Sequence, residues 1–342
     1  MYAFNLASMR KINVKAIIQY LLFLGLGLGL IWYSAKDLTP DQIRQLKDSI
    51  RQARFIYLIP VALSLLLSHY SRTLRWIILM KPLGYKPTVT NTYLAVLLGY
   101  FFNMLVPRLG EVMKCTVLAR YEKVAPDKLV GTILAERAVD FVSLFLVAII
   151  MVIVQFDRVG AYAIETFSNL VKSKSGEFSW LNFLLTLAVI AILVFGLRWL
   201  FKKYGHKGIL LRLKVVGQGI MEGIKSLKNI DRKGEFLVHS VVIWALYLIG
   251  IYLGFLAFPP VKHLGFQATV SILVFGSLGM IATQGGIGAY QIAVEKTLKL
   301  FGISSVLGLA FGWLIWASQT GIVLLSGVAA LIILPIVNRK KL

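Results

Sequence analysis

The chain has 342 residues, 58% of them hydrophobic, with a mean hydropathy of +0.77 and a formal net charge of +22. This composition excludes a soluble globular protein, which needs far more polar surface, and a membrane β-barrel, whose alternating strands give no long apolar runs. The basic residues lie mostly in loops between apolar segments, which favours anionic lipid headgroups over nucleic acid as their partner. We therefore predict an all-α fold, a polytopic membrane helical bundle.

The first apolar segment covers residues 14–33. Basic residues precede it as in a signal peptide, but the run is longer than an ordinary signal core, which favours an uncleaved span. A short amphipathic helix over 39–54 follows, and Thr39 and Gln42 have the spacing of a capping box. Its apolar side chains share one face, so we expect this helix to lie on the membrane surface.

The second predicted span covers residues 55–80 and carries His69, Arg72 and Arg75 at helical spacing near its end. Two interpretations stay open. The long side chains could extend to the cytoplasmic interface, or they could form a basic lip that binds an anionic headgroup. Arg72 and Arg75 are therefore candidate substrate-binding residues.

The most unusual stretch covers residues 103–140, where charges occur inside an apolar protein. Each charge costs about 2.5–3.5 kcal/mol in the centre of a bilayer, so charges are rare there without a function. Pro107 and Gly110 interrupt the helical pattern where these charges begin. A broken helix beside buried charges is typical of a polar cavity within the membrane. The charged residues of this stretch include Arg108, Glu111, Lys114, Arg120, Glu136, Arg137 and Asp140.

Two pieces of this region, residues 90–106 and 109–119, are each shorter than the roughly 20 residues that a span requires. We therefore predict a re-entrant hairpin near 90–120 that enters from the cytoplasm and turns at Pro107–Gly110. The helix amides after the turn favour an anion, and Arg108 is a bidentate donor suited to phosphate. We take Asn103, Glu111 and Lys114 as further substrate-binding candidates.

The next predicted span, residues 127–156, carries Glu136, Arg137 and Asp140 close to its start. Glu136 and Asp140 are four residues apart and so share one helix face. These charges either form an ion-pair network that locks helices together, or line the cavity and pair with Arg108 or a cationic headgroup.

The later part of the chain repeats the plan of an apolar piece, a break and an amphipathic helix near 265–301. Beyond the first break, the sequence predicts an external loop over 157–177, a span over 178–201, a basic interfacial helix over 206–229, a span over 235–258, and a last segment over 304–337. That last segment is long enough for one tilted span or for one and a half. Its basic tail places the C-terminus in the cytoplasm, with the N-terminus, and the whole single domain over 1–342 has seven to eight spans.

The second break contains a glycine run that lacks the preceding strand and the following Gly-Lys-Ser/Thr of a nucleotide loop. It therefore predicts a tight turn that either packs helices or lines a path. This hairpin enters from the outside, so the two hairpins have the opposite orientations that inverted-repeat transporters show. Its substrate-binding candidates are Gln284, Gly285, Gly286, Gly288, Tyr290 and Gln291.

Three motifs carry a resemblance to a known family: PRLGE at 107–111 with Lys114 after it, AERAVD at 135–140, and QGGIGAY at 284–290. At these motifs the chain resembles the lysylphosphatidylglycerol synthase/flippase transmembrane domain family. The resemblance implies an integral membrane protein with a lipid-translocating role. Family members often have Pro and Glu where this chain has Gln284 and Gln291, a departure that weakens an acidic role there. The soluble aminoacyl-transferase domain of the full synthases is not expected here, so synthase activity is not implied.

The leading functional hypothesis is a lipid flippase or transporter in the cell membrane, acting on a phospholipid or a polyprenyl-phosphate-linked lipid with an anionic or zwitterionic headgroup. A membrane-embedded transferase is the second, although the sequence has no DxD-type cluster or HExxH to hold a catalytic metal. A non-catalytic scaffold of the cell envelope is the third. Cys115 is the single cysteine, which excludes a cysteine-based metal site. We expect no cofactor and no metal, and the sequence indicates no particular oligomeric state.

Overall fold

The computed structural model describes residues 14–36, 38–156 and 232–339, together with the isolated positions 179, 180, 184 and 230. Within these residues the regular elements are helices and no strand occurs. The predicted external loop, the predicted span over 178–201 and the predicted interfacial helix over 206–229 lie outside the described residues, apart from three single positions. The all-α prediction is therefore confirmed for the described part of the chain.

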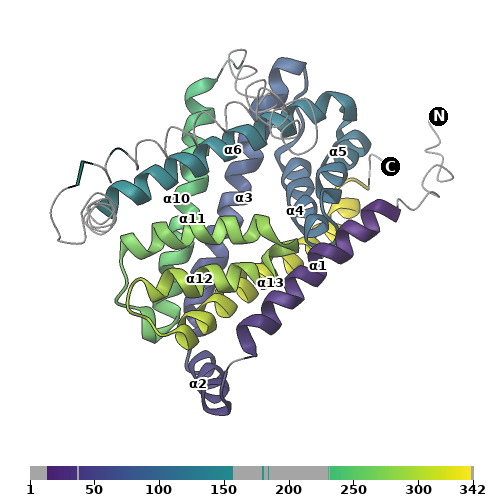
Figure 1. Cartoon of the computed structure of the whole chain (residues 1–342). Helices are drawn as coiled ribbons and strands as arrows, with labels where there is room; N and C mark the ends of the chain where they lie inside the picture. The colour runs from purple at the N-terminus through teal and green to yellow at the C-terminus, as the bar shows by residue number, and fades with distance from the viewer. Residues whose placement is uncertain are drawn as a thin grey trace. The chain divides into compact units, whose positions relative to one another are not determined.

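The chain divides into two compact units, and each is described by itself. One unit comprises residues 1–132 and 230–342, and the other comprises residues 133–229. The prediction of a single domain stays a prediction. The helices are α1 (Val14–Ala35), α2 (Pro40–Arg51), α3 (Leu58–Met80), α4 (Val89–Leu105), α5 (Leu109–Glu122), α6 (Pro126–Val154), α10 (Lys233–Ala257), α11 (Phe266–Ala282), α12 (Ala289–Lys299) and α13 (Ser305–Val337), with short 3-10 turns η2 (Phe55–Tyr57), η3 (Lys81–Leu83), η5 (Pro259–Val261) and η6 (Gln284–Gly286) (Figure 1). The boundary between the units falls within α6.

Four helical segments of the described part are long and apolar enough to cross a membrane, judged by length and composition. They are Phe55–Leu83, Lys128–Val154, Lys233–Ala257 and Ser305–Val337. They match the predicted spans over 55–80, 127–156, 235–258 and 304–337. The last of them is one continuous helix of 33 residues, which excludes the alternative of one and a half spans. The first predicted span corresponds to α1, a helix of 22 residues.

The amphipathic helix after α1 begins as its sequence predicts. The Gln42 amide donates to Thr39 Oγ1 at 3.3 Å, and the Thr39 amide donates to Gln42 Oε1 at 3.0 Å, which completes a capping box. The helix ends at Arg51, three residues earlier than expected. No residue of α2 is buried. Its position on a membrane surface stays a prediction.

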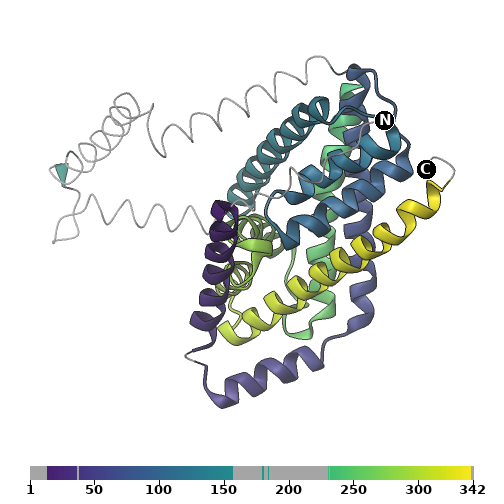
Figure 2. The same ribbon diagram turned by 90° about the vertical axis from the view of Figure 1, so that its right-hand side faces the viewer.

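Helices α3 and α10 lie side by side and antiparallel, and they form the scaffold of the first unit (Figure 2). At one end the Arg54 amide, just before α3, donates to the Ala257 carbonyl at the end of α10 (2.7 Å). Near the other end Ser71 Oγ lies 3.0 Å from His239 Nδ1, close to the start of α10. Between these points Gly250 packs against Ser64 so closely that an added Cβ would lie 2.8 Å from the serine hydroxyl.

Helices α4 and α5 form the first short pair, with 17 and 14 residues. The start of α4 meets the end of α5, because Thr88 Oγ1 donates to Glu122 Oε1 (2.7 Å) and the Thr88 amide donates to Glu122 Oε2 (3.1 Å). Asn91 also binds Glu122, and it exchanges two amide hydrogen bonds of 2.9 and 2.8 Å with Asn338 at the end of α13. The pair therefore opens at the end of the unit where α13 ends.

Helices α11 and α12 form the second short pair, with 17 and 11 residues. The pair begins just after α10 ends, and a short turn through Gly302 leads from it into the start of α13. Because α13 has 33 residues, its two ends lie about 50 Å apart at 1.5 Å per residue. The two short pairs therefore open toward opposite ends of α13.

Candidate functional site

The first break is a three-residue turn, Val106–Arg108, between α4 and α5. Arg108 adopts a left-handed conformation (φ 64°), which costs a residue with a side chain about 1–2 kcal/mol. The Leu109 amide donates to the Val106 carbonyl (3.2 Å), and the Gly110 amide donates to Asn103 Oδ1 (2.8 Å). These two amides therefore serve the turn itself, contrary to the expectation that the amides at this helix start bind phosphate.

The second break meets the first. Gln284 Nε2 donates to the Asn103 carbonyl (2.7 Å) and the Met104 carbonyl (3.2 Å) in the last turn of α4. From α13, Trp316 Nε1 donates to the Gly285 carbonyl (2.8 Å). We call these five residues the tip contact, because they join the closed ends of both short pairs. The structure thus brings the predicted site residues Asn103, Gln284 and Gly285 together.

Two glycines permit the close approach of the elements around the breaks. A Cβ on Gly110 would overlap the Gly99 carbonyl oxygen, so α4 and α5 cross backbone to backbone. Gly288 has φ 76°, and a Cβ there would overlap the Gly27 carbonyl oxygen of α1. Gly288 therefore serves the packing of α1 against the second break.

Tyr290 and Gln291 follow the second break but pack away from the tip contact. Tyr290 is 4% exposed and its ring lies against Gly276 of α11, while Gln291 is 1% exposed and its backbone lies against Gly312 of α13. The amide oxygen and nitrogen of the Gln291 side chain have no hydrogen-bond partner among the described atoms. Both residues thus belong to the interior of the α11–α12–α13 packing.

The most unusual electrostatic feature of the first unit is a group of buried basic side chains on α3 and α5. We call His69, Arg72, Arg75 and Lys114 the basic cluster; their exposed fractions are 2%, 5%, 0% and 8%. The charges of Arg72 and Lys114 both act electrostatically on His69. Their burial contradicts the interpretation in which Arg72 and Arg75 extend to a membrane interface. The alternative, in which they bind an anionic headgroup, stays a prediction.

Aromatic rings and hydroxyl groups hold the cluster in place on both sides of α3. His69 stacks on Tyr100 of α4, with ring centroids 4.1 Å apart, and the Arg72 guanidinium lies 5.9 Å from the same ring. Lys114 Nζ lies 4.1 Å from the centroid of the Trp76 ring, a distance at which a cation and a ring attract each other. The cations therefore replace part of their lost hydration with ring faces.

Helix α10 supplies the hydroxyl partners of the cluster. Arg72 Nη2 donates to the Tyr247 hydroxyl (3.3 Å), and Arg75 Nη1 donates to Ser240 Oγ (3.2 Å). Both partners lie more than 160 residues along the chain from the arginines. The sequence alone gave no signal for them, because periodicity shows which face of a helix is polar but not which helix meets it.

Arg108 stands apart from the cluster. Its side chain is exposed at the turn, whereas Lys114 is buried six residues later. Six residues of α-helix correspond to about 9 Å along the axis. Glu111, between them, is half-buried and sits in the first turn of α5, where a carboxylate is favoured by the helix dipole.

The remaining predicted site residues lie on the part of α6 that belongs to the second unit. Glu136 is buried, Arg137 is exposed and Asp140 is half-buried. All three take part in interactions. The alternatives of an ion-pair network and a cavity lining both remain open for them. In the described ranges, no group of three or more His, Cys, Asp or Glu side chains is arranged to hold a metal ion.

Comparison with known proteins adds two findings. The family model described as the lysylphosphatidylglycerol synthase TM region matches residues 17–327. A UPF0104 membrane protein of Methanocaldococcus jannaschii is 26% identical over 141 residues, which are 40% of this chain and 36% of that protein. The match thus spans little more than a third of that relative's length. No solved structure matches the chain.

Proposed function

The chain belongs to the lysylphosphatidylglycerol synthase TM region family, and on that premise we propose that it is a flippase that moves lipid headgroups across the cell membrane. The resemblance drawn from the three motifs is confirmed by this membership, and so is the assignment as a membrane protein. The lipid substrate would be a phospholipid or a polyprenyl-phosphate-linked lipid. Its headgroup, anionic or zwitterionic, would cross through the protein while its tails stay in the bilayer.

The two short helix pairs would be re-entrant hairpins that enter from opposite leaflets. None of their helices exceeds 17 residues, fewer than the roughly 20 that cross a bilayer. Their closed ends meet at the tip contact and their open ends lie at opposite ends of α13. With both termini in the cytoplasm, the α4–α5 pair would enter from inside and the α11–α12 pair from outside. This is the arrangement in which inverted-repeat transporters bind substrate near the midplane.

The observation that carries the proposal is the burial of the basic cluster next to the meeting point of the pairs. Tyr100, whose ring contacts His69 and Arg72, lies three residues before Asn103 on α4, so this side of the cluster is about one helical turn from the tip contact. Buried charges in a membrane protein are costly and mark substrate pathways. Arg72, Arg75 and Lys114 suit a phosphate group, and Glu111 would balance them or contact a cationic headgroup.

Translocation in proteoliposomes tests the proposal. The purified protein is reconstituted with a fluorescent phospholipid, and a membrane-impermeant reductant reports how fast the label leaves the inner leaflet. We expect Lys114→Gln and Arg72→Gln to slow this exchange about tenfold or more, while Lys47→Gln on the exposed face of α2 leaves it unchanged. Normal exchange in both cluster variants would overturn the assignment of the site.

The same assay separates the flippase from the two other hypotheses. A transferase would form a new lipid product only when a labelled group donor is added, and a scaffold would move no lipid in the absence of other proteins. Arg108→Ala and Glu136→Ala belong in the same series. They test whether the exposed turn and the second unit contribute to the path.

A further inference from the structure

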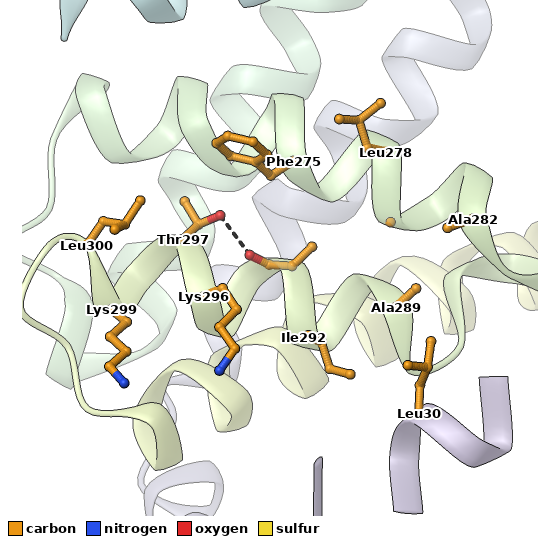
Figure 3. Close-up of a pocket in the computed structure, with 12 residues that line it drawn as sticks. Leu30, Phe275, Leu278, Ala282, Ala289, Ile292, Lys296, Thr297, Lys299 and Leu300 are labelled. Carbon is orange, nitrogen blue, oxygen red and sulfur yellow. Dashed lines mark hydrogen bonds between the residues drawn. The ribbon is translucent and has the colours of Figure 1, made fainter. Parts of the chain in front are cut away.

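A groove opens between α1, α11 and α12, and its lining includes no residue of the basic cluster or the tip contact. Its volume is about 660 Å³, within the roughly 300–1,000 Å³ that is usual for small-molecule sites. Most of its lining is apolar, including Leu30, Phe275, Leu278, Ile292 and Leu300 (Figure 3). Leu278 and Leu300 at its edges are 51% and 70% exposed. In a membrane protein such edges face lipid chains.

Two lysines stand at one end of the groove. Lys296 and Lys299 lie in the last turn of α12, and Figure 3 shows both side chains extending in the same direction, away from Phe275 and Leu278. Lys296 pairs with Glu295 at 3.3 Å, and its side chain is still 67% exposed. Glu295 itself is 7% exposed, and Lys299 adds a second cation at this end. The groove end therefore carries net positive charge.

The groove runs along α12. Lys299 and the groove residue Ala289 are ten residues apart on this helix, about 15 Å along its axis. One acyl chain spans half of the roughly 30 Å hydrocarbon core, so the groove is about as long as one chain. Ala289 follows the second break directly, and the lysines stand at the open end of the pair. An apolar groove about as long as one acyl chain, with cations at one end, matches the chain and the charged headgroup of a phospholipid.

We propose that this groove holds one acyl chain of an anionic phospholipid, whose phosphate binds Lys296 and Lys299. The helix dipole also stabilises basic residues in the last turn of a helix. That effect alone would account for both lysines without any preference for a lipid. The two explanations differ in one measurable property, the selectivity for anionic over zwitterionic headgroups. Binding at equilibrium does not require translocation, so this inference does not rest on the proposed flippase function.

The test places a fluorescent reporter in the groove. Cys115→Ala removes the single native cysteine, and Ala293→Cys carries a bimane label. The labelled protein is put in nanodiscs of phosphatidylcholine that contain a small fraction of a lipid with brominated chains. That lipid is phosphatidylglycerol in one series and phosphatidylcholine in the other. We expect brominated phosphatidylglycerol to quench the label at a severalfold lower mole fraction than brominated phosphatidylcholine. Ile292→Cys provides a second reporter if the first variant does not fold.

The lysines are then tested against a matched control. Lys296→Gln with Lys299→Gln should abolish the difference between the two brominated lipids. Lys262→Gln, exposed at the same end of the unit but outside the groove lining, should leave the difference intact. Equal quenching by both lipids in the unmodified background would overturn the proposal, and so would the absence of quenching by either, because another occupant then fills the groove. Lipid exchange in proteoliposomes is measured on the same variants. It tests the flippase proposal independently of lipid binding in the groove.

Discussion

At the first break the left-handed residue is Arg108, whereas at the second break Gly285, Gly286 and Gly288 take that conformation. The first break is capped by the Asn103 side chain and leads within two turns to the buried Lys114. The second contains no charged residue and is held by Gln284 and by Trp316. The two turns thus serve different roles. The first delivers charge to the interior, and the second permits close packing.

The largest effect is expected where the first pair is packed most tightly. Gly110→Val should lower the free energy of unfolding by about 3 kcal/mol or prevent folding, because its side chain would overlap the Gly99 carbonyl and force α4 from α5. Thermal unfolding in detergent followed by size-exclusion chromatography measures this loss. Gly131→Ala on α6, where an added Cβ meets open space, is the control and should be neutral or slightly stabilising. Equal stability of both variants would show that the close crossing is not required.

The join between the two breaks comes next. Gln284→Ala removes the amide that donates to the Asn103 and Met104 carbonyls, and should cost about 1–3 kcal/mol because those carbonyls are left in a largely buried contact. The same unfolding assay detects the change, with Gln45→Ala on the exposed surface of α2 as the reference. If Gln284→Ala unfolds like the reference, the tip contact contributes little to stability.

The charge of Lys114, which follows the first break, can be tested separately from the packing of its side chain. Lys114→Met keeps much of the length of the side chain but removes its charge, so the fold should survive while lipid exchange falls about tenfold, or about 1.4 kcal/mol in barrier. Exchange in proteoliposomes and the melting temperature are measured on the same preparation. A parallel loss of stability and exchange would point to a structural role for the cation, against its proposed role in the path.

The smallest change makes the first break resemble the second. Arg108→Gly relieves the left-handed conformation of a residue with a side chain, and should raise the free energy of unfolding by up to about 1 kcal/mol. Lipid exchange by this variant shows whether the exposed guanidinium is used. A more stable protein with normal exchange would place the substrate contacts at the basic cluster alone.

The sequence predicted the start of α2 and both breaks because these depend on local chemistry. Pro107 and Gly110 interrupt one run of apolar residues, and Thr39 with Gln42 form the expected cap. The prediction that the amides at the start of α5 bind an anion was wrong for Leu109 and Gly110. The Gly110 amide donates to the Asn103 side chain, and the Leu109 amide donates to the Val106 carbonyl.

The basic cluster was only partly predicted. Arg72, Arg75 and Lys114 were chosen as site residues, but their burial depends on Tyr100, Trp76 and helix α10. Such pairings join segments far apart in the chain. A single sequence shows which face of each helix is polar but not which helix packs against that face. Neither Tyr247 nor Ser240 could therefore be assigned as a partner.

The paired amides of Asn91 and Asn338 have a consequence for the order of assembly during synthesis. Asn91 starts the first short pair, and its partner Asn338, 2% exposed, comes 247 residues later. The ribosome must therefore finish nearly the whole polypeptide before Asn91 can form these two bonds. Until then the start of α4 is held to the end of α5 by Glu122, and truncation before Asn338 would permanently remove this link between the open end of the pair and α13.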